Sequence, residues 1–291
     1  MKNIFLSVIF ALGVLVTARS QADGNPIINR DGMPIDYSDC GKGGITLLFV
    51  HGWNINKEYW QAQLDHFCPK YRVVAIDLPG FRQPEAKREA WTVEAFGEDV
   101  IQTMETLDLK KVILIGHSMG GDIILEAALK ASDRVIGLIG IDNFKDPRTS
   151  YSPEEEEGLK QFLAALRADY PNVVEAGAEA QLFHPDTDPV VKKRVLDDFK
   201  SVRPEVAIGS IELLIYYAKK ETEQLQRLDN KLYLVNSDYT PTDEEALTKY
   251  CGAGFEIIPI HATGHFPMIE KPAEFNQKLE VAIDKVLDNE K

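Results

Sequence analysis

Two kinds of apolar pattern alternate along this chain. Short unbroken apolar runs, rich in branched side chains, predict strands that are covered on both faces of a sheet. These runs are residues 45–50, 71–76, 111–115, 135–141, 231–235 and 255–260. Between them, apolar residues spaced three or four apart predict helices over 93–107 behind a capping Thr92, over 120–131, and from Pro272 onward. Strands that alternate with helices predict an α/β fold with a mostly parallel sheet and right-handed crossovers.

The alternation is interrupted between residues 145 and 229, where no strand-like run of comparable strength occurs. This interval carries helical spacing instead, so we predict a helical insertion. The α/β core is then discontinuous and comprises residues 23–144 and 230–291. Ahead of the first buried strand, a turn signal followed by a short alternating run over 30–37 predicts an N-terminal hairpin.

The first 22 residues are typical of a secretory signal peptide. A positive Lys2 precedes an apolar stretch over 4–16, and small residues follow at 18, 20 and 22. The apolar stretch is shorter than the roughly 17 to 25 residues that a membrane-spanning helix needs. We therefore expect cleavage after Ala22, no stable membrane anchor, and a periplasmic or secreted protein.

The amino-acid composition and the net charge argue against one class of binding partner. The chain has 291 residues, of which 44% are hydrophobic and 27% charged, as in an ordinary globular protein. Its 46 acidic and 32 basic residues give a net charge of −14, and loss of residues 1–22 would remove two basic residues and make it −16. A surface this negative repels a phosphate backbone, which argues against a nucleic-acid partner.

Three cysteines are present, and an exported protein can form disulfides. Cys40 and Cys68 both lie just outside predicted strands, and we predict that they form a disulfide and that Cys251 is free. The alternative is three small buried apolar side chains. The sequence holds no common zinc, redox-dithiol or P-loop signature, so we expect no metal and no cofactor.

One segment carries a specific chemical signal. Gly116-His117-Ser118-Met119-Gly120-Gly121 lies between a predicted strand and a predicted helix. A serine on a sharp strand-to-helix turn needs glycines two positions away on either side, because backbone and helix approach closely there. Ser118 is then a candidate nucleophile, and the backbone N–H of Met119, at the helix start, a candidate donor to an oxyanion. The alternative is a helix-capping serine in a glycine-rich turn.

This arrangement resembles the α/β-hydrolase fold family, whose fold is a mostly parallel twisted sheet flanked by helices with an inserted helical lid. The segment 49–53 is similar to the family's H-G-x segment, which implies that Trp53 supplies the second oxyanion N–H. The segment 77–80 is similar to its D-x-P-G turn, although the G-x-G-x-S continuation common in the family is replaced by Gly80-Phe81-Arg82-Gln83. The resemblance implies that 145–229 forms the lid and that the base is His265, in a G-H-F segment after the last strand.

The third member of a catalytic triad is a carboxylate that orients the histidine. The chain order of nucleophile, acid and histidine favours Asp238, which follows the strand 231–235. Asp142, at the end of the strand before the insertion, is the alternative acid, and Asp243 is a further rival. His261 is expected to pack or hydrogen-bond locally. The predicted catalytic residues are therefore Ser118, Asp238 and His265.

We expect a serine hydrolase that acts on a small molecule with a carbonyl group, an ester first of all. The same triad also serves C–C bond hydrolysis, amide cleavage, perhydrolysis and cofactor-free lyase reactions in this family. A non-catalytic binding module with the same fold is the alternative of another class. Substrate choice is expected to depend on the insertion. Its larger apolar residues, which either line a pocket or pack on the core, include Phe162, Phe183, Leu214, Tyr216 and Tyr217.

Overall fold

The computed structural model describes residues 27–28, 33–83 and 86–289, and the predicted signal peptide over 1–22 lies outside these residues. Seven strands form one sheet in the order β3-β5-β4-β6-β7-β8-β9. The strands are β3 Tyr37–Cys40, β4 Thr46–Val50, β5 Arg72–Ile76, β6 Val112–His117, β7 Val135–Ile141, β8 Leu232–Val235 and β9 Phe255–Ile257. Only β3 is antiparallel to its neighbour; every other pairing is parallel.

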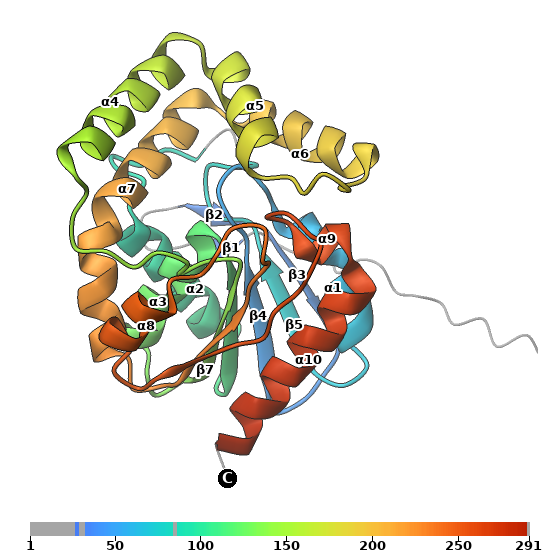
Figure 1. The fold of residues 1–291 in the computed structure, drawn as a ribbon. Coiled ribbons are helices and arrows are strands. Elements are labelled where there is room, and N and C mark those ends of the chain that lie inside the picture. The colour runs from blue at the N-terminus through green and yellow to red at the C-terminus, as the bar shows by residue number, and fades with distance from the viewer. Residues whose placement is uncertain (1–26, 29–32, 84–85, 290–291) are drawn as a thin grey trace, which may run out of the picture.

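Helices cover both faces of this sheet (Figure 1). They are η1 Lys57–Trp60, α1 Gln61–Phe67, α2 Val93–Thr106, α3 Met119–Lys130, α8 Glu244–Tyr250, α9 Pro267–Glu270 and α10 Pro272–Asn289. Every residue of β4 and of β6 is buried, as expected for strands with a helix layer on each face. The predicted α/β fold is confirmed, and the fold places the ends of β6, β7 and β9 at one edge of the sheet. Among the described residues, no helix is long and apolar enough to cross a membrane.

Two predicted elements differ from the structure in detail. The last predicted strand extended to residue 260, but β9 ends at Ile257 and only an isolated bridge joins Ile260 to Ser237. Pro259 lies in the missing part and has no N–H to donate to a strand ladder. At the N-terminus, β1 Ile27–Ile28 pairs antiparallel with β2 Pro34–Ile35, as the predicted hairpin requires. Its turn, residues 29–32, is outside the described part of the chain.

Four helices follow β7 and precede β8 in the chain, and they extend over one edge of the sheet (Figure 1). They are α4 Pro153–Ala168, α5 Tyr170–Gln181, α6 Pro189–Ser201 and α7 Pro204–Arg227. Each has a proline at its first or second position, where the missing N–H has no intrahelical partner to lose. The long α7 packs against α2 and α3, so it joins the inserted helices to the core.

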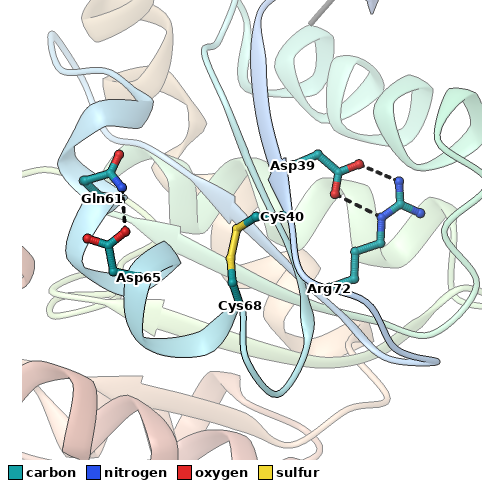
Figure 2. The surroundings of a disulfide bond; sticks show 6 residues. All are labelled: Asp39, Cys40, Gln61, Asp65, Cys68 and Arg72. Atoms are coloured by element: carbon teal, nitrogen blue, oxygen red, sulfur yellow. Dashed lines mark hydrogen bonds and ion pairs between the residues drawn. A yellow bond between two sulfur atoms is a disulfide. The ribbon is translucent and has the colours of Figure 1, made fainter. Parts of the chain in front are cut away.

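A disulfide joins Cys40, at the end of β3, to Cys68, directly after α1 (Figure 2). The Cα atoms are 5.6 Å apart, within the usual range for a disulfide. Cys251 is buried and free, so both cysteine predictions are confirmed. Gly41 follows Cys40 with φ of 71°, and a Cβ there would lie 2.0 Å from the Tyr71 carbonyl oxygen. The chain can therefore turn out of β3 beside the disulfide only with glycine at this position.

We expect the double variant Cys40→Ser/Cys68→Ser to lose about 3 kcal/mol of unfolding free energy, because the bond closes a loop with a sequence separation of 28. Guanidinium unfolding of the oxidised wild-type protein and of the variant measures the difference. Reductant should lower the wild-type midpoint to that of the variant and leave the variant unchanged. Equal midpoints for the oxidised wild type and the variant would contradict this expectation.

Candidate active site

Ser118 sits on a strained turn between β6 and α3. Its φ of 51° and ψ of −125° are unusual for a residue with a Cβ. A Cβ at Gly116 would lie 2.3 Å from the Gly120 carbonyl oxygen, and one at Gly120 would lie 2.6 Å from the Val50 carbonyl oxygen. These close approaches are the reason for glycine two positions before and after the serine, as the motif predicted. Strain of this kind persists where surrounding packing holds a side chain in a functional position.

His265 lies in the loop between β9 and α9, and several contacts fix that loop. The backbone N–H groups of Gly264 and Phe266 both donate to the Glu270 carboxylate, at 2.9 and 3.0 Å. The N–H of His265 itself donates to the carbonyl oxygen of Leu182, in the inserted segment, at 2.8 Å. The imidazole of His265 is therefore held from the core and from the insertion together.

His117 holds the same loop through a hydrogen bond to its backbone. Its Nε2 is 2.7 Å from the His265 carbonyl oxygen, which can only accept, so Nε2 carries the proton. Burial and the neighbouring His265 lower the pKa of His117 to about 3, and the ring is neutral at physiological pH. His117 thus positions the backbone of His265 without adding a charge beside it.

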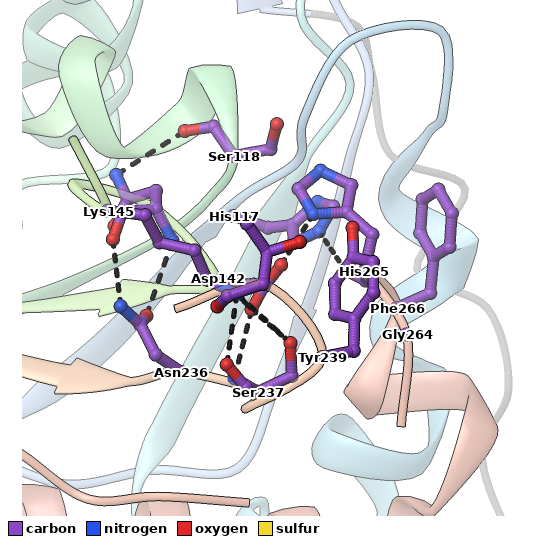
Figure 3. A network of polar contacts seen from close by, with 12 residues as sticks. His117, Ser118, Asp142, Lys145, Asn236, Ser237, Tyr239, Gly264, His265 and Phe266 are labelled. Atoms are coloured by element: carbon purple, nitrogen blue, oxygen red, sulfur yellow. Dashed lines mark hydrogen bonds and ion pairs between the residues drawn. The ribbon is translucent and has the colours of Figure 1, made fainter. Parts of the chain in front are cut away.

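Asp142 is the carboxylate that the structure brings to His265 (Figure 3). Its Oδ2 lies 2.6 Å from His265 Nδ1. Its Oδ1 accepts from the backbone N–H and the hydroxyl of Ser237, at 2.9 and 2.6 Å, and pairs with Lys145 Nζ at 2.7 Å. Burial alone would raise the pKa of Asp142, but the hydrogen bond and charges of His265 and Lys145 outweigh it and hold that pKa well below its usual range. The carboxylate is ionised and both oxygens are occupied.

The prediction that Asp238 is the partner of His265 is wrong. Asp238 Oδ2 lies 2.7 Å from Nδ1 of His261, and both side chains are more than half exposed. The local hydrogen bond expected for His261 is thus present. The remaining rival, Asp243, caps α8 by accepting from the Ala246 N–H at 2.9 Å. The chain order had suggested that the segment after β8 supplies the carboxylate. In the structure this segment supplies Ser237, which donates hydrogen bonds to Asp142.

Lys145 is a site residue that the sequence interpretation missed. Besides Asp142 it contacts the carbonyl oxygens of Ser237 and Thr240, each at 3.0 Å, and its Nζ lies 5.0 Å from the centre of the Tyr239 ring. Lys145 lies three residues after Asp142, and this spacing was the signal in the sequence that could have indicated their ion pair. Lys145 joins the segment after β8 to the carboxylate at the end of β7.

Two backbone segments flank Ser118 where an oxyanion could be bound. Met119 is the first residue of α3, and the N–H groups of a first helical turn have no intrahelical acceptor. On the other side, a Cβ at Gly52 would lie 3.0 Å from Ser118 Cβ, so the segment carrying Trp53 runs directly beside the serine. Trp53 is also tied to the insertion, because its indole Nε1 donates to the Ala207 carbonyl oxygen at 2.8 Å.

An apolar cavity of about 320 Å³ opens above Ser118 and His265, between the core and the inserted helices. Its walls are mostly aliphatic and aromatic, and Gln181 is the polar side chain that the insertion contributes. Residues from the insertion that line it include Leu159, Phe162, Val173, Val174, Gly177, Ala178, Leu182, Phe199, Ile211, Leu214 and Ile215. Such a cavity suits an apolar chain attached to a group that reacts at the serine. Among the described residues, no three His, Cys, Asp or Glu side chains are grouped to hold a metal ion.

Comparison with known proteins agrees with this geometry. A model of the α/β hydrolase fold family matches residues 45–272. The chain is 25% identical over 252 residues to a pimeloyl-[acyl-carrier protein] methyl ester esterase of Yersinia enterocolitica, covering 83% of this chain and 94% of the relative. A thermophilic esterase from Thermogutta terrifontis is 25% identical, with a TM-score of 0.77 over 90% of this chain and 98% of that one.

A third relative is longer. The chain is 27% identical over 267 residues to the dihydrolipoyllysine-residue acetyltransferase component of an acetoin cleaving system of Cupriavidus necator. The match covers 86% of this chain but only 66% of that relative, so the likeness concerns a part of the longer protein.

Proposed function

The chain belongs to the α/β hydrolase fold family, and from that premise we propose that it hydrolyses carboxylic esters through an acyl-enzyme formed on Ser118. One observation carries the proposal: a buried, ionised Asp142 is hydrogen-bonded to His265 at the cavity wall that also holds the strained Ser118. A serine hydroxyl needs a base, and an imidazole needs a carboxylate to fix its tautomer and stabilise its cation. The esterases among the relatives support the choice of ester.

In the proposed reaction, His265 Nε2 takes the proton of the Ser118 hydroxyl while the serine oxygen attacks the ester carbonyl carbon. His265 Nδ1 keeps its proton and donates a hydrogen bond to Asp142, whose negative charge stabilises the imidazolium. The N–H groups of Met119 and Trp53 donate to the carbonyl oxygen as it becomes negative.

The attack of Ser118 gives a tetrahedral intermediate. When it collapses, its bond to the alcohol oxygen breaks, and that oxygen takes the proton from His265 Nε2. Water then attacks the acyl-enzyme by the same sequence of proton transfers and releases the acid and the free serine.

We also propose that the protein works outside the cytoplasm, with residues 1–22 as its export signal. The disulfide between Cys40 and Cys68 supports this location, because cytosolic reductants keep most thiols reduced. The free Cys251 is compatible with it, since burial raises the pKa of its thiol to about 12 and keeps it unreactive.

The acyl half of the substrate is proposed to occupy the apolar cavity, and Gly177 offers a direct test. Gly177 lines the cavity from α5, and a Cβ there meets nothing within 4 Å. We expect Gly177→Leu to shift the preferred acyl length to shorter chains by filling part of the cavity. Hydrolysis of p-nitrophenyl esters from acetate to decanoate, followed as kcat/KM, measures the shift.

Gly158→Leu is the matched control, because Gly158 is an exposed position of α4 with equally open space and does not line the cavity. Both changes favour helix formation, since leucine has a higher helix propensity than glycine. An unchanged acyl profile in Gly177→Leu would contradict the placement of the acyl chain. Absence of hydrolysis across the whole series by the wild-type protein would contradict the proposed function.

A further inference from the structure

A second hollow also borders Ser118 and differs sharply in character from the apolar cavity. Its volume is about 270 Å³. Ser118, Leu214 and Ile215 line both spaces, so the serine lies where the two meet. Four carboxyl groups line the second hollow, and no basic side chain does among the residues that the structure describes there. These are Asp122, Asp142, Asp146 and Glu221.

Two of the four carboxyl groups are already matched with cations. Asp142 is held by Lys145 and His265, and Asp146 forms an ion pair with Arg148. Lys220 of α7, which precedes Glu221 in the chain, pairs with Glu94 at 2.7 Å and with Glu126 at 2.9 Å. None of Lys145, Arg148 and Lys220 pairs with Asp122 or Glu221.

Asp122 is different, because it is buried against a second carboxyl group, that of Glu221, and not against a cation. The side chain, in the first turn of α3, is 7% exposed, and its Oδ1 has no hydrogen-bond partner. Its carboxyl group faces Glu221 of α7, and burial raises the pKa of both, that of Asp122 to about 6. One proton shared between them leaves a negative charge in the hollow at neutral pH. A buried carboxylate oxygen without a donor is costly unless something binds to it.

We propose that this hollow, defined by Asp122, Asp146 and Glu221 beside Ser118, is a subsite for a protonated primary amine on the alcohol half of the substrate. The inference rests on the proposed ester hydrolysis. With the acyl chain in the apolar cavity and the carbonyl carbon at Ser118, the alcohol half extends past Leu214 and Ile215 into the second hollow. An ammonium group supplies hydrogen-bond donors and a positive charge to the pair of Asp122 and Glu221, the two carboxyl groups of the hollow that have no cation beside them.

Three hexanoate esters of similar length test the subsite: those of 5-aminopentanol, 1,5-pentanediol and 1-hexanol. We expect kcat/KM for the ammonium ester to exceed that for the hexyl ester about tenfold at low ionic strength, as a charge-assisted hydrogen bond in a partly open site allows. The preference should fall severalfold in 0.5 M NaCl, because the hollow is open to solvent. A higher rate for the diol ester than for the ammonium ester would overturn the proposal in favour of a hydroxyl site.

Asp122→Asn should reduce the tenfold preference to about twofold or less, because it removes the charge and keeps the shape. Asp133→Asn removes the same charge from an exposed position beyond the other end of α3, and the wild-type preference should persist there. An unchanged preference in Asp122→Asn would overturn the proposal. Should that variant not fold, the salt dependence of the wild-type preference decides, and a preference insensitive to salt counts against the subsite.

A binding measurement separates this proposal from the proposed reaction. Calorimetric titration of the Ser118→Ala protein with N-(5-aminopentyl)hexanamide and with N-hexylhexanamide needs no turnover. About tenfold tighter binding of the ammonium amide supports the subsite even if no ester is hydrolysed, an outcome in which only the reaction would fail. Equal affinities overturn the subsite even if all three esters are hydrolysed.

Discussion

Ser118→Ala is expected to abolish ester hydrolysis, with a loss on the order of 10⁶ in kcat, as found when the nucleophile of other triads is removed. The loss is this large because alanine has no oxygen to attack the ester carbonyl carbon from the strained turn between β6 and α3. Release of p-nitrophenol from a hexanoate ester measures it. The variant removes one oxygen and leaves Gly116 and Gly120 to hold the turn, so the thermal midpoint should stay close to that of the wild type.

A fluorophosphonate probe gives an independent measurement for the same residue. The probe should label the wild-type protein at Ser118 and leave Ser118→Ala unlabelled, since it reacts with a serine that a neighbouring base activates. Hydrolysis by Ser118→Ala at the wild-type rate, or labelling at another serine, would contradict the proposed nucleophile.

Asp142→Asn should lower kcat by about 10⁴, the effect of the same change in other triads. An amide in place of the carboxylate cannot stabilise the imidazolium of His265 and favours the wrong tautomer. It also leaves Lys145 without its carboxylate partner at 2.7 Å. Steady-state kinetics on the same hexanoate ester measures the loss.

Asp238→Asn is the matched control for that change, because the sequence order favoured Asp238 as the acid. Its carboxylate forms an exposed pair with His261, and exposed pairs contribute little to stability. We expect kcat within about twofold of the wild type. A large loss in Asp238→Asn with activity retained in Asp142→Asn would reverse the assignment made from the structure.

Local patterns were enough to predict the α/β layers and the position of Ser118, and the resemblance to the family added His265. The buried strands are visible in the sequence as short apolar runs. Ser118 lies in a motif whose glycines are required because the backbone segments approach closely there. The position of His265 after the last strand follows from the resemblance to the family. These features depend on residues that are close in sequence.

The acid could not be chosen in this way, because its identity depends on which strand end faces His265. Asp142 and Asp238 follow neighbouring strands and satisfy similar local rules. Only the packed structure shows that Asp142, directly after β7, is buried against His265, whereas Asp238, after β8, is exposed to solvent. Lys145 was missed for the same reason, since its partners Ser237 and Thr240 lie more than 90 residues away.

The cavity walls were predictable only in part. Of the apolar residues named from the insertion, Phe162 and Leu214 line the cavity. Tyr216 is 67% exposed, whereas Tyr217 is buried and its hydroxyl donates to Glu126 at 2.8 Å. These two tyrosines are neighbours on α7, and helical geometry points them in different directions. The apolar spacing predicts which side of α7 is covered but not which covered residue borders an empty space.

Two of the hydrogen bonds between the insertion and the core involve residues of the candidate site, and this restricts how the insertion could be exchanged with that of a relative. Leu182 accepts from the N–H of His265, and Ala207 accepts from the Trp53 indole. A Cβ at Gly264 would lie 2.4 Å from the Leu182 carbonyl oxygen, so the two backbones meet without room for a side chain. A cap grafted from a relative to change substrate range would have to reproduce the backbone path at these two positions, or the graft would displace His265. The insertion and the loop that carries His265 therefore cannot be exchanged independently in this chain. Directed evolution of the insertion should favour changes in the cavity wall over exchange of whole helices.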